Sequence, residues 1–125
     1  MITKQDLNRH EYPTTSEIDT NLDILLARLQ KLETEYGSPF IITSGLRSEE
    51  QQLGLIRNGL SNAVHSKHLI GAAADIADVD GALNKWCMNN SSALEEVGLW
   101  CEVRQGPWQH LQILPPASQH RWFNP

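Results

Sequence analysis

The chain has few cysteines, and this limits the kinds of metal or covalent site that it can build. Only two of its 125 residues are cysteines, Cys87 and Cys101. Structural zinc sites are typically closed by four ligands rich in Cys, so this class of site is poorly supplied here. A disulfide between the two is geometrically open, but their number gives no reason to assume one.

Long apolar runs and basic stripes are also missing. No run approaches the length of a membrane span, and the N-terminal residues MITKQDLNRHEY lack the apolar core of a secretory signal. We therefore expect no membrane span and no signal peptide, and synthesis in the cytoplasm. The formal net charge is −5, from 15 acidic and 10 basic residues that are scattered along the chain, which argues against a nucleic-acid partner.

The length predicts one domain, covering residues 1–125. A chain of this size buries enough surface to fold without a metal or a disulfide. We therefore expect any bound metal to be functional.

Hydrophobic periodicity predicts a long amphipathic helix in the first third of the chain. Thr14 and Glu17 are spaced as a capping box, and Gly37 ends the run. Between them, apolar residues recur at steps of three and four: Ile18, Leu22, Leu25, Leu29, Leu32 and Tyr36. This stripe is expected to cover a sheet.

The rest of the sequence predicts short strands and helices. Strands are predicted at 40–43, 73–78, 99–104 and 108–114, and helices at 48–57, 81–88 and 93–97, with a polar loop at 58–67. These elements predict an α+β fold, in which a small, mainly antiparallel sheet carries helices on one face and a metal in a cleft on the other.

Three residues have the chemistry of a catalytic zinc site. His68 and Asp75 lie in the segment SKHLIGAAADI, and His110 lies on a predicted strand far downstream. Catalytic zinc commonly takes three ligands from His and Asp or Glu, at about 2.0–2.2 Å, and leaves a position for water. The same donors do not exclude manganese, iron or cobalt. Taken singly, His68 is equally an exposed loop histidine and Asp75 a turn or cap residue.

The segment from Ser66 to Asp75 resembles the SxHxxGxAxD signature of the M15 zinc peptidases, with Gly71 and Ala73 in place. This is the group of D-Ala-D-Ala carboxypeptidases and L-alanyl-D-glutamate endopeptidases that includes many phage endolysins. The resemblance implies the hedgehog/DD-peptidase-like fold and a zinc ion on His68, Asp75 and His110, the last in a WxH context. The segment SGLRS is similar to the family segment whose arginine, here Arg47, faces the substrate.

The catalytic base is a departure from that family. Members commonly carry Glu or Asp three residues before the last zinc-binding His, where this chain has Pro107. A three-residue loop at 105–107 would pair Arg104 with Trp108 and, counting back, Glu102 with His110. We therefore expect Glu102 to be the base, with Asp78 as the next carboxylate to consider. The alternative for Glu102 is an ordinary exposed strand carboxylate.

Three further residues are candidates for substrate binding. Arg47 offers a planar fork of donors suited to a carboxylate, although a surface salt bridge with Glu49 or Glu50 is the default for a single arginine. Ser66 is expected to bond substrate or orient the site. Trp108 shares a strand face with His110 and is expected to line the site. The remaining histidines are expected to face solvent: His10, His65 and His120.

The function implied by these residues is zinc-dependent hydrolysis of peptide bonds in bacterial peptidoglycan by a monomeric phage-type lysis enzyme. Such a chain would act on the wall after release from the cell or as part of a virion. Two alternatives stay open: a non-catalytic wall-binding or virion module that keeps the zinc, and a metal-free scaffold. The position of Glu102 separates the first from the enzyme, and metal content separates the second.

Overall fold

A computed structural model describes residues 1–59 and 66–124. The expected loop at 58–67, with His65 in it, falls largely outside these residues. The helices are α1 (Lys4–Leu7), α2 (Ser16–Tyr36), α3 (Glu49–Arg57), the 3₁₀ helix η1 (Lys67–Ile70), α4 (Ala82–Asn89) and α5 (Ser91–Val97). The strands are β1 (Ile42–Ser44), β2 (Ala73–Ala77), β3 (Trp100–Glu102), β4 (Trp108–Gln112) and β5 (Trp122–Phe123). Within the described part of the chain, none of the helices is long and apolar enough to cross a membrane.

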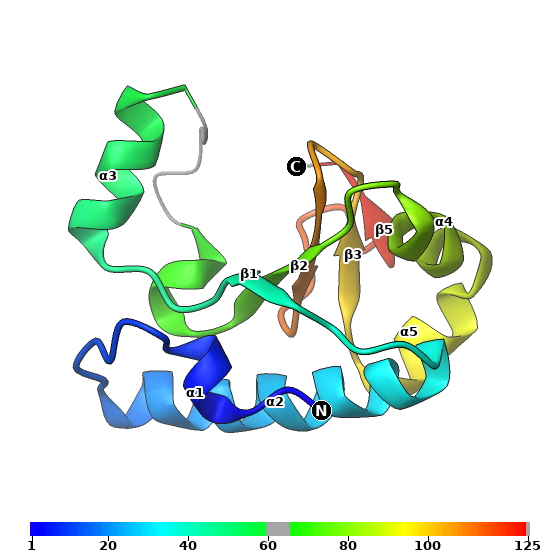
Figure 1. The fold of residues 1–125 in the computed structure, drawn as a ribbon, viewed down its shortest axis with the longest axis horizontal. Helices are drawn as coiled ribbons and strands as arrows, with labels where there is room; N and C mark the ends of the chain where they lie inside the picture. The colour runs from blue at the N-terminus through cyan, green and yellow to red at the C-terminus, as the bar shows by residue number, and fades with distance from the viewer. Residues whose placement is uncertain (60–65, 125) are drawn as a thin grey trace.

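The five strands form one sheet in the order β1-β2-β4-β3-β5 (Figure 1). The pairs β1·β2, β2·β4 and β3·β4 are antiparallel, and β3·β5 is parallel. The predicted α+β fold with a mainly antiparallel sheet is confirmed. Its central strands, β2 and β4, are the ones that carry Asp75 and His110.

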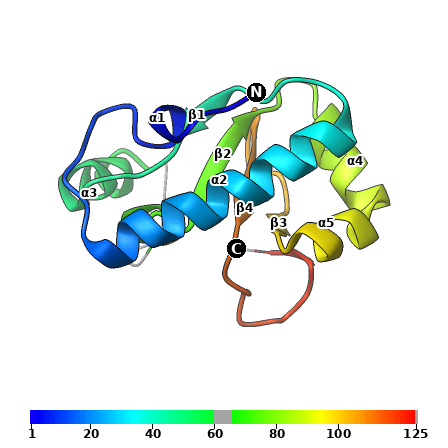
Figure 2. The same cartoon turned by 90° about the horizontal axis from the view of Figure 1, so that it is seen from below.

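The hydrophobic core lies between the sheet and α2, which runs beneath the strands in Figure 1 and crosses in front of them when seen from below in Figure 2. The apolar stripe of α2 joins alternate residues of the central strands in one buried cluster, including Leu25, Leu29, Ala74, Ile76 and Leu111. Since successive side chains of a strand point to opposite faces, Asp75 and His110 point away from this core.

The two ends of α2 were predicted with different success. Gly37 ends the helix in the left-handed conformation, as expected. The predicted capping box of Thr14 and Glu17 is wrong, because the N-cap is Thr15, whose side chain accepts a hydrogen bond from the Ile18 amide. The sequence favours Thr14, which has Glu17 three residues after it, but the fold selects the neighbouring Thr15.

The strands differ from their predicted bounds mainly at their ends. β1 begins two residues later than expected, and a bulge between Ile42 and Ser44 places Ser44 opposite Asp75. β2 ends at Ala77, because Asp78 turns away to bond the start of α4. β3 and β4 are shorter than expected but keep the predicted register: Trp100 pairs with Gln112 and Cys101 with Leu111. The predicted pair of Arg104 with Trp108 is wrong, because Trp108 forms its bridge with Gly106. The last pair of β3 with β4 is Cys101 with Leu111, and Glu102 follows it, with its carboxylate 3.9 Å from His110 Nε2.

Three of the described elements are absent from the sequence predictions: α1, η1 and β5. α1 has its own capping box, formed by Thr3 and Asp6. Its last residue, Leu7, accepts a hydrogen bond from the Leu46 amide at 2.7 Å. A Cβ on the intervening Gly45 would lie 2.2 Å from the Leu7 carbonyl oxygen, so only glycine allows this approach. α1 therefore fixes the path of the segment between β1 and α3.

Replacing Thr15 with Ala tests the position of the α2 cap. We expect a loss of about 1 kcal/mol in the free energy of unfolding, because an N-cap hydroxyl satisfies an otherwise unpaired amide. Thr14→Ala is the matched control and should stay within about 0.5 kcal/mol of wild type. Urea denaturation measures both, and a larger loss for Thr14→Ala would restore the original capping box.

Candidate metal centre

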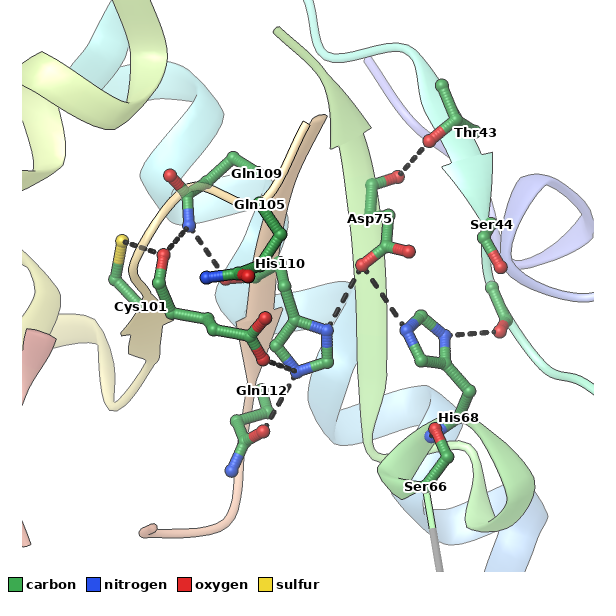
Figure 3. A network of polar contacts seen from close by, with 12 residues as sticks. Thr43, Ser44, Ser66, His68, Asp75, Cys101, Gln105, Gln109, His110 and Gln112 are labelled. Atoms are coloured by element: carbon green, nitrogen blue, oxygen red, sulfur yellow. Dashed lines mark hydrogen bonds and ion pairs between the residues drawn. The ribbon is translucent and has the colours of Figure 1, made fainter. Parts of the chain in front are cut away.

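His68, Asp75 and His110 come together at the middle of the sheet, with one ligand atom from each within 4.8 Å of the others (Figure 3). Asp75 Oδ1 is the shared atom. It lies 3.2 Å from His68 Nε2 and 3.1 Å from His110 Nδ1. Asp75 and His110 face each other across the β2·β4 pair, and His68 approaches from η1.

His68 is buried, and its ring orientation is fixed from two sides. Its Nδ1 lies 2.8 Å from the Gly45 carbonyl oxygen, which can only accept, so Nδ1 carries the proton and Nε2 has the free lone pair. Ser66 caps η1 by accepting a hydrogen bond from the His68 amide. Gly71 ends η1 at φ +72°, where a Cβ would press on α2. Ser66 thus orients His68, one of the two roles expected for it.

His110 is fixed by a glutamine two residues further along β4. Gln112 Nε2 donates to the Leu114 carbonyl at 2.7 Å, so Gln112 Oε1 must face His110 Nε2, 2.8 Å away. His110 therefore donates from Nε2, and its Nδ1 faces Asp75 Oδ1 at 3.1 Å. Such outer hydrogen bonds are what set the tautomer of histidines that bind metals.

Asp75 is held through its second oxygen and its backbone. Arg47 Nη2 donates to Asp75 Oδ2 at 3.1 Å, and Thr43 Oγ1 donates to the Asp75 carbonyl at 3.2 Å. The remaining Arg47 contacts are to Ser44 Oγ and Gln52 Oε1, both at 3.0 Å. The default reading of Arg47 as a surface partner of nearby glutamates is therefore wrong, because its ion pair is with Asp75 in the site.

This arrangement requires a positive charge between the three side chains. With each histidine donating from its other nitrogen, two imidazole lone pairs and a carboxylate oxygen would face one another at little more than 3 Å. Burial lowers the pKa of His68, so its neutral form is favoured. Burial alone would raise the pKa of Asp75, but the two histidines hold it far below its usual range. Burial also opposes charge on His110, but its hydrogen bond to Asp75 raises the pKa overall. A metal cation satisfies the same three acceptors, so these residues fit one.

Glu102 lies at the edge of this cluster. Its Oε2 is 3.9 Å from His110 Nε2, and 17% of its side chain is exposed. Burial raises the pKa of Glu102, and the attraction of His110 only partly offsets this. Glu102 is thus not the exposed strand carboxylate of the alternative interpretation. At 3.9 Å, its carboxylate also lies beyond hydrogen-bond distance of His110 Nε2.

Two other predicted residues have clear positions. Trp108 shares its face of β4 with His110, and its ring lies over Gly106, where a Cβ would come within 2.2 Å. Asp78 is buried and its two oxygens accept from the Leu83 and Asn84 amides at 2.9 and 3.0 Å. Asp78 is therefore committed to the start of α4. His10 and His120 are exposed, as expected.

The residues that orient the ligands were not predicted from the sequence. Gln112 and Gln109 are buried glutamines that flank His110 on β4, and the Gly45 carbonyl lies far from His68 in sequence. Gln112 lies two residues after His110, so the two side chains share one face of the strand. This spacing is the one sequence signal for the role of Gln112. The Gly45 contact has no comparable signal.

Comparison with known proteins agrees with this geometry. The model of the peptidase M15 family matches residues 1–111. The chain belongs to the peptidase M15 family. Its fold is similar to the crystal structure of the Serratia marcescens L-Ala D-Glu endopeptidase ChiX, with a TM-score of 0.55 and 23% identity over 86% of this chain and 95% of that one. No curated protein matches. M15 members are metallopeptidases, and the three converging side chains are where this chain can hold the metal.

Metal binding is testable without any substrate. We expect ZnCl₂ at about 100 times its Kd to raise the free energy of unfolding of wild type by about 2.7 kcal/mol, since it binds the folded state. His68→Ala should lose most of this gain, and His120→Ala, an exposed histidine, should keep it. Equal stabilisation of wild type and His68→Ala in thermal melts with and without zinc would place the metal elsewhere.

Proposed function

We propose that this chain is a zinc-dependent peptidase that hydrolyses amide bonds in the stem peptides of bacterial peptidoglycan, as a single-domain, monomeric lysis enzyme of phage type. The observation that carries the proposal is the convergence of His68, Asp75 and His110 in a chain of the peptidase M15 family. The similarity in fold to an L-Ala D-Glu endopeptidase supports the choice of substrate.

The three ligands suit zinc because they combine two imidazole nitrogens with one carboxylate oxygen and leave room for a fourth group. Zinc in such a site supplies a water of lowered pKa and a Lewis acid for the scissile carbonyl. The protein's contribution is to orient both imidazoles toward the metal position. Gly45 O and Gln112 Oε1 do this by accepting the protons of the outer nitrogens.

Glu102 is the proposed general base. Its carboxylate takes a proton from the attacking water and passes it to the nitrogen of the leaving amine. Partial burial raises the pKa of Glu102, which makes the carboxylate a stronger base than an exposed glutamate. Its place beside His110, on the neighbouring strand, brings it to the edge of the ligand cluster.

Arg47 and Trp108 are the proposed substrate contacts. The Arg47 guanidinium is largely buried at the site and pairs with Asp75, so it is oriented before substrate arrives. Its planar fork suits the carboxylates in which stem peptides are rich. Trp108 offers an aromatic wall on the same strand face as His110. Ser66 acts through η1, by fixing the His68 amide.

One observation favours a second function, a zinc-containing wall-binding or virion module without catalysis. Pro107 stands where family members commonly carry the acidic residue, and proline cannot transfer a proton. In this case Glu102 would have no catalytic role. The two functions differ in a single result, the appearance of new peptide termini.

Replacing Glu102 with Gln separates them. The purified protein, loaded with zinc, is incubated with defined peptidoglycan, and new termini are identified by mass spectrometry. We expect wild type to release them and Glu102→Gln to do so about 10²- to 10⁴-fold more slowly, with zinc content unchanged, because the near-isosteric amide cannot accept the proton. Glu95→Gln, on the exposed surface of α5, should match wild type. An unaltered rate in Glu102→Gln would move the base elsewhere, and full zinc with no turnover in wild type would favour the binding module.

Arg47→Lys tests whether Arg47 binds a substrate carboxylate or only orients Asp75. A lysine keeps the charge but cannot reproduce a bidentate fork. We expect a higher KM on a stem peptide with a free carboxylate and a much smaller effect on the same peptide with that carboxylate amidated. If Arg47 only orients Asp75, the variant should instead lose zinc affinity, typically by 10- to 100-fold, and treat both peptides alike.

A further inference from the structure

Gln109 is the most completely buried polar side chain near the site, with 0% of its surface exposed, and the mechanism above does not use it. It neighbours His110 on β4 but points to the opposite face, toward the core. Its amide nitrogen donates two hydrogen bonds, to the Glu102 carbonyl at 2.7 Å and to the His110 carbonyl at 2.9 Å (Figure 3). Both of its protons are therefore used.

These two acceptors lie where the regular pairing of β3 and β4 ends. The paired residues are Trp100 with Gln112 and then Cys101 with Leu111. Just beyond this last pair, the Gln109 side chain joins the carbonyls of Glu102 on β3 and His110 on β4. It thus takes the place of a ladder contact at the residues that carry the proposed base and a proposed metal ligand.

Gln109 is itself fixed from the helix side. Asn84 Nδ2 donates to Gln109 Oε1 at 2.6 Å, which sets the orientation of the Gln109 amide. The Asn84 backbone amide in turn bonds Asp78 Oδ2 at 3.0 Å, at the start of α4. The chain of contacts runs from the end of β2 through α4 to the β3·β4 pair, so the hairpin is anchored to the strand that carries Asp75.

We propose that Gln109 is a positioning residue that holds Glu102 opposite His110 and so sets the distance between the base and the metal centre. Its catalytic consequence rests on the proposed peptidase function, but the positioning itself is a structural property. Displacing a catalytic group by about 1 Å can cost on the order of 10²-fold in rate. Gln109 therefore affects kcat through Glu102, without contact to substrate or metal.

The test replaces Gln109 with Met, which keeps the length of the side chain and removes both donors. Crystal structures of wild type and variant give the separation of Glu102 Oε2 and His110 Nε2, which is 3.9 Å here. We expect it to grow by about 1 Å in the variant, with kcat lower by about 10- to 100-fold and KM and zinc affinity little changed. In a Glu102→Gln background the same substitution should cost no further rate, because the residue through which it acts is already disabled.

Two controls keep the result decisive. Gln30→Met removes a similar amide-to-carbonyl bond, from Gln30 Nε2 to the Ile2 carbonyl at 2.9 Å, far from the site, and should leave kcat unchanged. Asn84→Ala loosens Gln109 while keeping its donors, and it supplies the same readouts if the Met variant does not fold. An unchanged separation, or an equal loss of rate in the wild-type and Glu102→Gln backgrounds, would overturn the proposal. A wild type that holds the separation but cleaves no wall peptide would refute the peptidase function and leave the positioning role standing.

Discussion

The site depends on one oxygen atom, Asp75 Oδ1, which two imidazole nitrogens approach to 3.2 and 3.1 Å. Each outer nitrogen donates to an oxygen acceptor, the Gly45 carbonyl or Gln112 Oε1, so both inner nitrogens face the carboxylate. Two neutral imidazoles would place their lone pairs against it, and a positive charge, either a proton on His110 or a metal cation, removes this repulsion. The surrounding fold holds the three side chains together through these outer contacts, so the site is arranged to receive a cation.

The sheet order explains how these contacts are assembled from distant parts of the sequence. β2 lies between β1 and β4, so Asp75 has the SGLRS segment on one side and His110 on the other. The bulge in β1 sets Ser44 opposite Asp75, and the chain then turns so that the Gly45 carbonyl reaches His68 and Arg47 reaches the second oxygen of Asp75. Bulges commonly re-aim side chains next to functional sites. Here the turn is possible only because Gly45 lets the Leu7 carbonyl approach within a distance that any Cβ would block.

Residue patterns predicted those parts of the fold that depend on periodicity and loop length. The α2 stripe and the Gly37 end follow from local chemistry, and the register of Trp100 with Gln112 and of Cys101 with Leu111 follows from counting across a short turn. The ligand set came from the signature of the family. What the sequence did not predict depends on tertiary contact: the choice of Thr15 as cap, the bulge in β1, and the short elements α1, η1 and β5. The glutamines that orient His110 and Glu102 belong to the same class, since a buried amide is defined by partners that meet it only in the folded chain.

Pro107 bears on how the proposed base, Glu102, would be held in place. The resemblance to the M15 family implies an acidic residue three positions before the last ligand, where a few backbone torsions of one strand would fix its place relative to the metal. Here that position carries a proline, whose carbonyl accepts from the Asp78 amide at 2.9 Å and ties the hairpin to the end of β2. A carboxylate supplied across the hairpin, by Glu102, depends instead on strand register, and register is weakest where a ladder ends. A base supplied from the neighbouring strand therefore requires a contact that holds the two strands together at that point. Gln109 provides this contact, because its buried side chain bonds both strands there.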